Sequence, residues 1–285
     1  MIDSIINKVQ RKSQDFGLDV RRCLNAKRDL VIYKELYNPT DLKKRPFLNF
    51  GAGRFRHPYW MNVDHASGWY SSVQSVGQVE WDILELSKCP LEDGFAYIAY
   101  SSHTIEHLTD IAVKHLFKEV YRMLRPNGVF RITAPDALLI YDAYMRKDIL
   151  FYMREHGEIP LAGKQASLEE IFVHYFAPQR LQYHPEAKEN NILYTEDIAK
   201  ILASNLFEDA MRLITEKCDL EIQSRNPGNH INWWTLEKTK QLMEDAGFSI
   251  IQASAFGQSR CAVMRNTAFF DNTRPRVSFY VEAVK

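Results

Sequence analysis

The stretch "FLNFGAGRFRHPYWMNVD" (residues 47–64) decides the fold, because it joins two short apolar runs through a glycine pair. The first run, "FLNF", leads into Gly51-Ala52-Gly53, and the second, "WMNVD", ends in Asp64. Glycines directly after a strand let the backbone approach a ligand closely, although ordinary turns also use them. The stretch therefore predicts two buried strands with a ligand-binding loop between them.

The spacing of the loop excludes the two common phosphate-binding patterns. A dinucleotide fingerprint needs G-x-G-x-x-G and an acidic residue about 20 positions further on. Here Phe55 and Arg56 follow the glycine pair, and Asp64 comes too early. The GxxxxGK[ST] pattern of a P-loop is absent from the sequence. The loop therefore indicates neither a pyrophosphate nor a triphosphate ligand.

Further apolar runs alternate with helical patterns. The segments "QVEWDI" (78–83), "YIAYSS" (97–102) and "VFRITA" (129–134) predict three more short strands. Between the last two, "DIAVKHLFKEVYRMLR" (110–125) has apolar residues at helical spacing and is followed by the helix-stopping turn "RPNG". This alternation predicts an α/β fold with a mostly parallel sheet.

The regular alternation stops after Asp136. The following residues are mostly helical in pattern and rich in Tyr, Phe and His, and we interpret them as an insertion that covers the site. Thr235 and Gly247 are then expected to cap a return helix, "LEKTKQLMEDA", and two closing strands follow it. The predicted division is an N-terminal helical segment (1–45), a core domain (46–136 and 229–285) and a helical insertion or lid over the acceptor site (137–228).

The bulk composition is that of a soluble globular protein with no basic excess. The chain has 285 residues, and Lys+Arg and Asp+Glu both number 36, so no nucleic-acid partner is expected. No apolar stretch is long enough for a transmembrane segment. Four scattered cysteines fit free thiols in a reducing, cytoplasmic compartment.

The polar N-terminus predicts an amphipathic helix packed on its own domain, with a membrane-surface contact through residues 1–30 as the alternative. The sequence carries no signal for an oligomeric state.

Two carboxylates follow the second and third predicted strands, where α/β sheets bind their ligands. A carboxylate accepts hydrogen bonds from two hydroxyl groups, so Asp64 is a candidate for binding a ribose. Asp82 is a candidate acceptor for an adenine amino group. The alternative for each is a solvated loop residue or a helix cap.

These motifs, in this order, resemble class I S-adenosylmethionine-dependent methyltransferases. The similar segments are "LNFGAG", "NVD", "WDILE", "CPLEDG", "YSSHTIEHL", "LFKEVYRMLRPNGVFRITAPD" and "LMEDAGF". The most similar is the type-11 group found among predicted polysaccharide-biosynthesis methyltransferases, and the tail "FDNTRPRVSFYVEAVK" resembles that group too. The resemblance covers residues 46–136 and 229–285. It implies a Rossmann-like seven-stranded, mostly parallel sheet with an antiparallel last strand.

The resemblance also implies S-adenosyl-L-methionine as the cofactor, bound by the glycine loop, the two carboxylates and the end of the fourth strand. The cofactor-binding residues predicted in this way are Asn49, Gly51, Ala52, Gly53, Asp64, Asp82, Ser101, Ser102 and His103. Three positions depart from the family pattern. Asn49 stands where an acidic residue is frequent, the third glycine is missing, and "RPNG" replaces the common "KPGG".

The segment "SSHTIEHL" brings titratable groups to the end of the fourth strand, where the resemblance implies the methyl donor. Imidazole titrates near neutral pH, so His103 is the first candidate for a catalytic base that takes a proton from an attacking hydroxyl or amine. His230, in "NHINWW", is the second candidate, because this region approaches the acceptor in the resembling group.

Glu106 and His107 follow His103 at i+3 and i+4, so one helical turn would bring the three together. Some metal-dependent methyltransferases have a similar pattern, E-x-x-E-H, with an acidic residue first. Because a histidine takes that first position, we predict no metal, and Glu106 and His107 are the candidate ligands if one binds. The alternative is a structural role in which Glu106 holds loops beneath the cofactor.

The resemblance implies a methyltransferase that O-methylates a sugar or glycan precursor in surface polysaccharide biosynthesis. The saccharide acceptor rests on the resemblance alone. A methyltransferase acting on a small aromatic or amine metabolite is the first alternative. A cofactor-binding module without transfer activity is the second, and the titratable groups of "SSHTIEH" argue against it.

Overall fold

The computed structural model describes residues 9–10, 12–13, 25–66, 78–156, 160–161 and 164–285. The predicted N-terminal amphipathic helix lies almost entirely outside these residues, so neither its packing nor its alternative membrane contact is described. None of the helices in the described part of the chain combines the length and apolar character needed to cross a bilayer.

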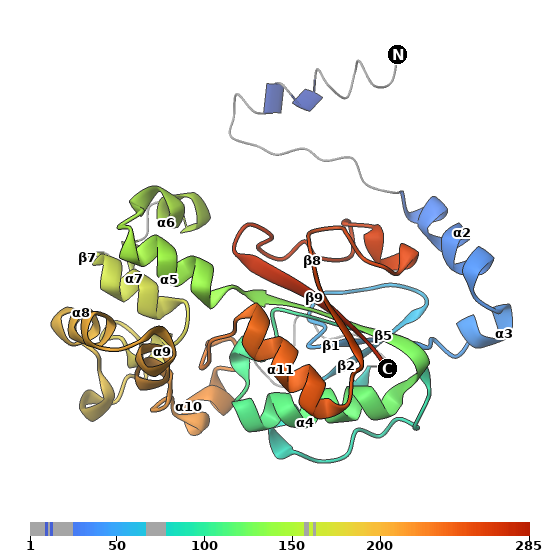
Figure 1. Cartoon of the computed structure of the whole chain (residues 1–285), viewed down its shortest axis with the longest axis horizontal. Coiled ribbons are helices and arrows are strands. Elements are labelled where there is room, and N and C mark those ends of the chain that lie inside the picture. The colour runs from blue at the N-terminus through green and yellow to red at the C-terminus, as the bar shows by residue number, and fades with distance from the viewer. Residues whose placement is uncertain (1–8, 11, 14–24, 67–77, 157–159, 162–163) are drawn as a thin grey trace.

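Seven strands form one sheet in the order β3-β2-β1-β4-β5-β9-β8 (Figure 1). Strands β1 to β5 pair in parallel, and β9 lies antiparallel between β5 and β8. The predicted Rossmann-like sheet with an antiparallel last strand is therefore confirmed. The strands are β1 (Phe47–Phe50), β2 (Trp60–Asp64), β3 (Val79–Glu80), β4 (Ala96–Ser102), β5 (Leu124–Pro135), β8 (Ile250–Ser254) and β9 (Ser278–Val284).

The predicted third strand is too long. Only Val79 and Glu80 pair with β2. Further along, the Asp82 carboxylate accepts a hydrogen bond from the backbone N–H of Leu84 at 2.8 Å and begins the short 3-10 helix η2 (Ile83–Glu85). This local side-chain bond offers the backbone an alternative to strand pairing.

The boundary between the central helix and the fifth strand also differs from the prediction. Helix α4 ends at Met123, and β5 begins at Leu124 rather than at residue 129. Pro126 disfavours helical geometry in the residue before it, so the chain becomes extended ahead of the turn. The "RPNG" segment therefore lies within the bounds of β5, where Asn127 has φ at 63° and the pairing with β4 shifts register.

Helices cover both faces of the sheet. On one face α4 (Asp110–Met123) and α11 (Leu236–Ala246) pack together over the strands. The opposite face is covered by α2 (Ala26–Leu36), α3 (Pro39–Leu42) and the C-terminal 3-10 helix η6 (Ala262–Arg265), which join an aromatic-rich cluster. As predicted, the Thr235 side chain caps α11 by accepting from Lys238 N, and Gly247 ends it with φ at 107°.

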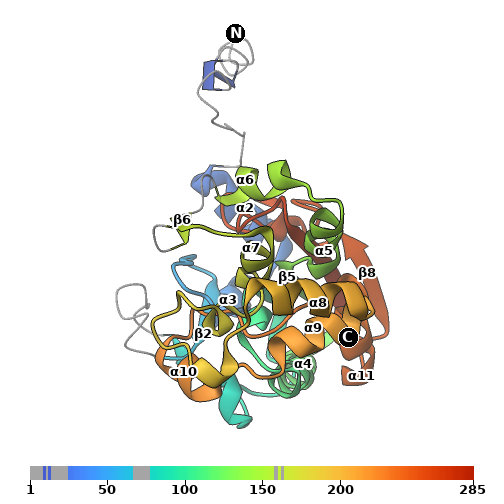
Figure 2. The same ribbon diagram turned by 90° about the vertical axis from the view of Figure 1, so that its left-hand side faces the viewer.

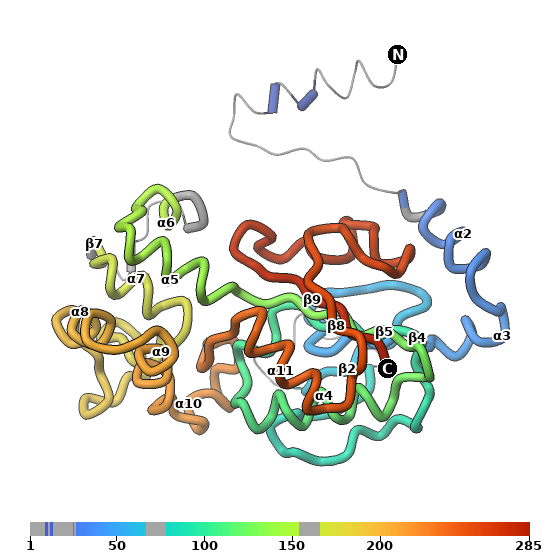
Figure 3. The backbone as a smooth tube through the Cα atoms, viewed as in Figure 1, coloured from blue at the N-terminus to red at the C-terminus, as the bar shows by residue number. Residues whose placement is uncertain are grey.

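Residues 137–228 form a group of helices beside the sheet with an apolar cluster of their own. The chain leaves the sheet after β5, passes through this group and returns to the sheet at α11 (Figures 2 and 3). The helices are α5 (Ala137–Met145), α6 (Ile149–His156), α7 (Leu168–His174), α8 (Thr195–Ser204), α9 (Phe207–Thr215) and α10 (Leu220–Arg225), with a small hairpin of β6 (Pro160–Leu161) and β7 (Lys164–Gln165).

A buried arginine connects the antiparallel end of the sheet. Arg131, in β5, is fully buried and binds both carboxylate oxygens of Asp271 at 3.0 and 2.6 Å. It also binds Glu282 of β9 at 3.0 Å and Ser254 of β8 at 2.9 Å. Planar guanidinium groups satisfy several acceptors at once, so one side chain fastens β5, β8, β9 and the loop before β9.

The arginine network predicts a large stability effect. Arg131→Met leaves the buried carboxylates of Asp271 and Glu282 without a counter-charge, and we expect the free energy of unfolding to fall by about 3–5 kcal/mol. Urea denaturation measures this. The control is Arg146→Met, because Arg146 forms an exposed pair with Asp142 that should contribute about 0–1 kcal/mol. Equal effects of the two substitutions would contradict a structural role for the network.

Candidate functional site

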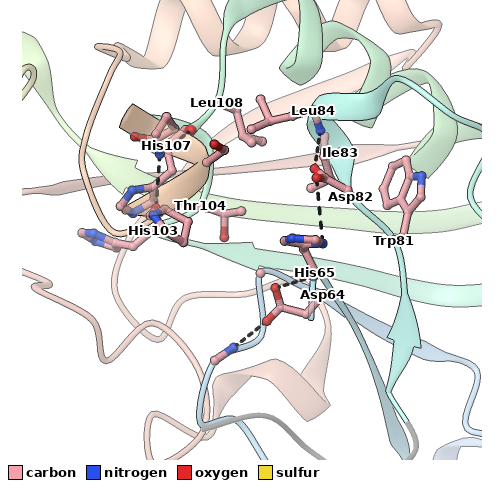
Figure 4. A pocket seen from close by; sticks show the side chains of 15 residues that line it. Asp64, His65, Trp81, Asp82, Ile83, Leu84, His103, Thr104, His107 and Leu108 are labelled. Carbon is pink, nitrogen blue, oxygen red and sulfur yellow. Dashed lines mark hydrogen bonds and ion pairs between the residues drawn. The ribbon is translucent and has the colours of Figure 1, made fainter. Parts of the chain in front are cut away.

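A cavity of about 300 Å³ lies at the carboxyl ends of β1, β2 and β4 (Figure 4). Its walls come from the glycine loop, the ends of β2 and β3, the turn after β4 and the end of the helical group at α10. Trp81, Ile83 and Leu84 give one side an apolar surface, whereas Asp64 and Asp82 bring carboxylates. A mostly apolar wall with a few polar groups is typical of a small-molecule site.

The two glycines of the loop serve different purposes. Gly51 has φ at +63°, and a Cβ atom there would lie 2.3 Å from the side-chain oxygen of Thr104. Gly53 has φ at +49°, and a Cβ atom there would meet nothing within 4 Å. Gly51 thus lets the loop pack against the turn after β4, while Gly53 leaves open space beside the cavity. That space fits a ligand lying against the backbone.

Asp64 connects the glycine loop to the end of β2. Its carboxylate accepts hydrogen bonds from the backbone N–H groups of Gly53 at 3.1 Å and His65 at 2.9 Å. Burial raises the pKa of this carboxyl group above its usual value, although these backbone donors oppose the shift. The side chain lines the cavity, so a carboxylate acceptor is present where a ribose was expected.

Asp82 has the helix-cap role that the sequence offered as an alternative. It caps η2, and its Oδ2 lies 3.8 Å from the Nδ1 atom of His65. The side chain also lines the cavity, opposite His103 and His107 (Figure 4). Asp82 therefore both caps η2 and lines the cavity.

A second cavity, of about 550 Å³, borders the first. The two cavities share Gly51, Gly53 and His103. The second is more polar, with Asn49, Ser102, Arg54, Arg56, Asn272 and Thr273 among its lining residues and Phe269 as an aromatic surface. The site therefore has two compartments that meet at the glycine loop and at the end of β4.

The predicted cofactor-binding residues divide between these compartments. Those that line the first cavity are Gly51, Gly53, Asp64, Asp82 and His103. Those that line only the second are Asn49, Ala52 and Ser102. Ser101 is fully buried and lines neither of the two.

His103 is held on all sides at the junction of the two cavities. Its backbone is in the left-handed region, with φ at +52°, and its N–H donates to the Thr133 carbonyl at 2.9 Å. Its Nδ1 lies 3.1 Å from Oε1 of Glu106, and its Nε2 lies 2.8 Å from the Ser278 hydroxyl. Because a carboxylate only accepts, the Nδ1 atom carries a proton, and Nε2 is the nitrogen left to accept one.

Glu106 is the most deeply buried carboxylate of the site. The residue is 2% exposed, and its Oε2 atom has no hydrogen-bond partner among the described residues. Burial opposes its charged form, but the imidazoles of His103, His107 and His230 outweigh this effect and lower the pKa of its carboxyl group to about 2. Glu106 is therefore a buried negative charge at neutral pH.

His107 and His230 stand beside this carboxylate. Their ring centroids lie 4.8 Å apart, and Nε2 of His230 is 4.0 Å from Oε1 of Glu106. Burial lowers the pKa of His230 to about 3, so this imidazole is neutral at pH 7. His230 lines a third cavity of about 300 Å³ together with His174 and His184 from the helical group. The structure thus brings the two predicted base candidates, His103 and His230, to the same carboxylate.

The segment before α11 wraps around the turn after β4. The backbone N–H groups of Ile231 and Asn232 both donate to the Glu106 carbonyl, at 2.9 and 3.2 Å. The indole N–H of Trp234 donates to the Ile105 carbonyl at 2.8 Å. Trp234 and Trp233 are 1% and 8% exposed and belong to apolar clusters, so both pack in the interior.

Sequence reasoning missed part of the lining. Gln223, Ser224 and Pro227 reach the first cavity from the helical group, and no local motif marks them. Trp81 could have been found, because it directly precedes Asp82 in a predicted strand end. Thr104 had no signal of its own, since its role depends on the close approach of Gly51.

Comparisons with known proteins show what this chain resembles. Residues 61–132 match a family model described as a methyltransferase domain. A crystal structure of an S-adenosylmethionine-dependent methyltransferase from Mesorhizobium loti is similar at 15% identity over 84% of this chain and 90% of that chain, with a TM-score of 0.39. A second, from Archaeoglobus fulgidus, has 13% identity over 90% and 94% and a TM-score of 0.39. No curated protein matches the sequence significantly.

The chain therefore carries a class I methyltransferase domain. It is an S-adenosylmethionine-dependent methyltransferase, and S-adenosylmethionine is its cofactor, as the resemblance of the sequence implied.

The glycine loop generates a prediction with an internal control. Gly51→Ala should lower the free energy of unfolding by about 2–5 kcal/mol, because the new methyl group meets both a left-handed backbone and the Thr104 side chain. Gly94 has nearly the same φ, +65°, but open space around it, so Gly94→Ala should cost only about 1–2 kcal/mol. Adding Thr104→Ala to Gly51→Ala should recover part of the difference in urea denaturation, because it removes the atoms at 2.3 and 2.5 Å but leaves the Cβ atom of residue 104 at 2.9 Å. Equal losses at the two glycines would contradict the close-approach argument.

Proposed function

We propose that this enzyme transfers the methyl group of S-adenosylmethionine to a hydroxyl group of a sugar or glycan precursor, in the synthesis of a surface polysaccharide. The observation that carries the proposal is the position of His103, which lines both the cavity at the strand ends and the larger polar cavity beside it. Methyl transfer needs the methyl donor and the acceptor to meet in line, and His103 lies where the two cavities that could hold them meet.

We assign the first cavity to the nucleoside part of the cofactor. Asp64 would accept hydrogen bonds from the ribose hydroxyl groups, and Asp82 would accept from the adenine amino group, with the apolar side of Trp81 and Leu84 against the base. Gly51 and Gly53 would let the methionine part pass close to the backbone toward the second cavity. In this arrangement Asn49, Ala52 and Ser102 contact the methionine end or the acceptor.

We assign the acceptor to the second cavity. Amide, hydroxyl and guanidinium groups from Asn49, Asn272, Thr273 and Arg54 line it, and the aromatic ring of Phe269 gives it one flat side. Sugars present many hydroxyl groups around a weakly apolar ring face, so such a lining supports a saccharide better than an apolar aromatic acceptor. The reducing, cytoplasmic location expected from the cysteines suits a nucleotide-sugar or glycan precursor.

His103 would act as the base. Glu106 keeps the proton of the imidazole on Nδ1, so Nε2 can take a proton from an acceptor hydroxyl as the methyl group is transferred. The Ser278 hydroxyl lies 2.8 Å from that same Nε2 and 2.8 Å from the Arg274 carbonyl oxygen. Its single proton can go to only one of them, and in the tautomer with Nδ1 protonated it goes to Nε2. An acceptor hydroxyl would therefore replace Ser278 as the neighbour of Nε2 or share the position with it. His230 is the second candidate for the base.

We also propose that residues 137–228 serve as a lid over the acceptor, as an insertion between the two parts of the methyltransferase domain (46–136 and 229–285). Gln223 and Pro227 already reach the first cavity from this segment, and His174 and His184 line the third. None of the described residues of this segment lines the second cavity, so the lid would close over the acceptor from the side of the first and third cavities. The N-terminal segment, residues 1–45, supplies α2 and α3, which pack on the sheet in a cluster that also contains Phe55 and Phe269 from the wall of the second cavity.

Transfer to the proposed acceptor is tested with S-adenosylmethionine that carries a labelled methyl group. The purified enzyme is incubated with nucleotide-sugar, cell-glycan and small-metabolite fractions in parallel. We expect label in a base-stable ether on a saccharide. Label that appears only in an aromatic or amine fraction would replace the saccharide proposal by the alternative of a small-metabolite methyltransferase.

Two substitutions separate the base from the cofactor site. His103→Ala should lower kcat by about 10²–10⁴-fold and leave the affinity for S-adenosylhomocysteine nearly unchanged, because the base acts only on the transferred proton. Asp64→Ala should weaken that affinity by about 1–3 kcal/mol, because ribose hydroxyl groups lose their buried acceptor. Calorimetry and initial rates measure the two effects, with Glu85→Ala, an exposed carboxylate on η2, as the control. A loss of affinity in His103→Ala with normal turnover would refute the base role.

A further inference from the structure

Three potential metal ligands converge beneath His103. One ligand-capable atom from each of Glu106, His107 and His230 lies within 4.8 Å of the other two. The first two residues belong to the turn after β4, and the third comes from the segment before α11, more than a hundred residues later. A grouping of two imidazoles and a carboxylate from such distant parts of the chain is built by the fold and does not follow from a single helical turn.

The hydrogen bonds of the two imidazoles determine which nitrogen is available. Nδ1 of His107 lies 2.8 Å from the carbonyl oxygen of Asn229, and Nδ1 of His230 lies 2.6 Å from the carbonyl oxygen of Tyr175. A carbonyl oxygen can only accept, so both Nδ1 atoms carry protons, and Nε2 is the nitrogen of each ring whose lone pair can bind a metal ion. Ligating histidines in metalloproteins are usually oriented in this way, by donation of the other ring N–H to a carbonyl or carboxylate.

The carboxylate between them is incompletely satisfied. Glu106 is 2% exposed, and its Oε2 atom has no hydrogen-bond partner among the described residues. The one close partner of its Oε1 atom is Nδ1 of His103, at 3.1 Å. A buried carboxylate oxygen beside two nitrogen lone pairs, with no donor between them, is unfavourable unless a cation or a proton occupies the space.

We propose that Glu106, His107 and His230 bind one divalent first-row transition-metal ion. Imidazole nitrogen and carboxylate oxygen together suit ions such as Mn²⁺, Fe²⁺ and Zn²⁺, and three protein ligands leave coordination positions open. Nitrogen and oxygen ligands at about 2.1 Å from an ion lie roughly 3–4 Å apart, so the cluster closes slightly on the ion. His230 has a quarter of its side chain exposed and can make that adjustment.

This site changes the interpretation of the "HTIEH" segment. The sequence alone predicted no metal, because a histidine replaces the acidic residue at the first position of the pattern. In the structure His103 donates to Glu106 and so orients the ligating carboxylate, while His230 supplies the third ligand from elsewhere in the chain. His103 is thus a partner of the cluster and is not one of its ligands.

The position of the cluster suggests what the ion does, and this step rests on the proposed function. His107 lines the first cavity, and His230 lines the third cavity beside the helical group. His103, whose Nδ1 lies 3.1 Å from Glu106, lines the second cavity, to which we assign the acceptor. An acceptor that extends from the second cavity past His103 can place a hydroxyl oxygen in an open coordination position, where the ion acidifies it. The acceptor hydroxyl would then be oriented by the ion and deprotonated by the imidazole.

Direct metal binding tests the proposal. The full-length chain, freed of any affinity tag, is treated with chelator, dialysed and titrated with Mn²⁺, and free Mn²⁺ is followed by electron paramagnetic resonance. Replacement by Co²⁺ is followed by visible absorption. We expect one equivalent per chain, and at least a tenfold weaker affinity for His230→Ala and His107→Ala. His115→Ala is the control, because this half-buried imidazole on α4 contacts the Ser87 carbonyl and the Trp81 ring, does not belong to the cluster and should leave the affinity unchanged.

Two results would overturn the site. One is the absence of saturable binding of Mn²⁺ or Co²⁺ to the wild-type chain. The other is an unchanged affinity in His230→Ala, which is the variant least expected to disturb folding because its side chain is partly exposed. Methyl transfer measured on the same samples separates the two proposals. Methyl transfer by the metal-free enzyme would reject the role of the ion in the reaction and keep the proposed function. A bound ion without methyl transfer to any saccharide would reject the proposed function and keep the metal site.

Discussion

The burial of one carboxylate organises the site of this protein. Removing the charge of Glu106 from water costs several kcal/mol unless other groups compensate. Part of the compensation comes from the Nδ1 proton of His103 at the end of β4, 3.1 Å from the carboxylate. The imidazole of His230, from the segment before α11, lies 4.0 Å from the carboxylate and, being neutral, adds no counter-charge. The backbone carbonyl of Glu106 accepts from two N–H groups of that segment. The carboxylate and its carbonyl thus hold the sheet edge and the returning chain together.

The left-handed backbone of His103 follows from this arrangement. A non-glycine residue with φ at +52° is strained, and the strain persists only where surrounding contacts maintain it. Here the backbone N–H is bound by Thr133, and both ring nitrogens have partners on Glu106 and Ser278. The result is a rigid imidazole at the junction of two cavities, with its proton on a defined nitrogen. The contacts that maintain the strained backbone of His103 therefore also fix the position of the imidazole that we propose as the base.

Much of the fold could be predicted from the sequence because its signals are local. The short apolar strands, the caps at Thr235 and Gly247, and the order of the motifs depend on neighbours within a few residues, and the structure confirms the sheet that they imply. The misplaced boundaries have local causes as well. At Asp82 a side chain competes with strand pairing, and before Pro126 the helix ends early. At each of these two wrong boundaries, a single residue favours a backbone conformation other than the one that the apolar pattern predicts.

The site was less predictable, because its geometry depends on distant contacts. Spacing in the sequence grouped His103, Glu106 and His107, but it could not show that His230 joins them or that a carbonyl holds each Nδ1 atom of His107 and His230. The polar second cavity and the reach of Gln223 into the first have no local signal at all. Hydrogen bonds between remote segments determine these features.

The same contacts explain how the helical group is attached to the methyltransferase domain. Its helices have an apolar cluster separate from those of the sheet, so burial of apolar surface does most to hold the group together internally. One attachment is apolar, because Trp233, from the segment before α11, packs in this cluster against Phe207. The attachment to the turn after β4 is polar: the amide of Gln223 donates to the carbonyl of His107 and also to that of Asn229. Directional bonds fix position more strictly than apolar contacts do. The apolar packing inside such a segment can change while the directional hydrogen bonds hold His107, His230 and the walls of the first cavity in position.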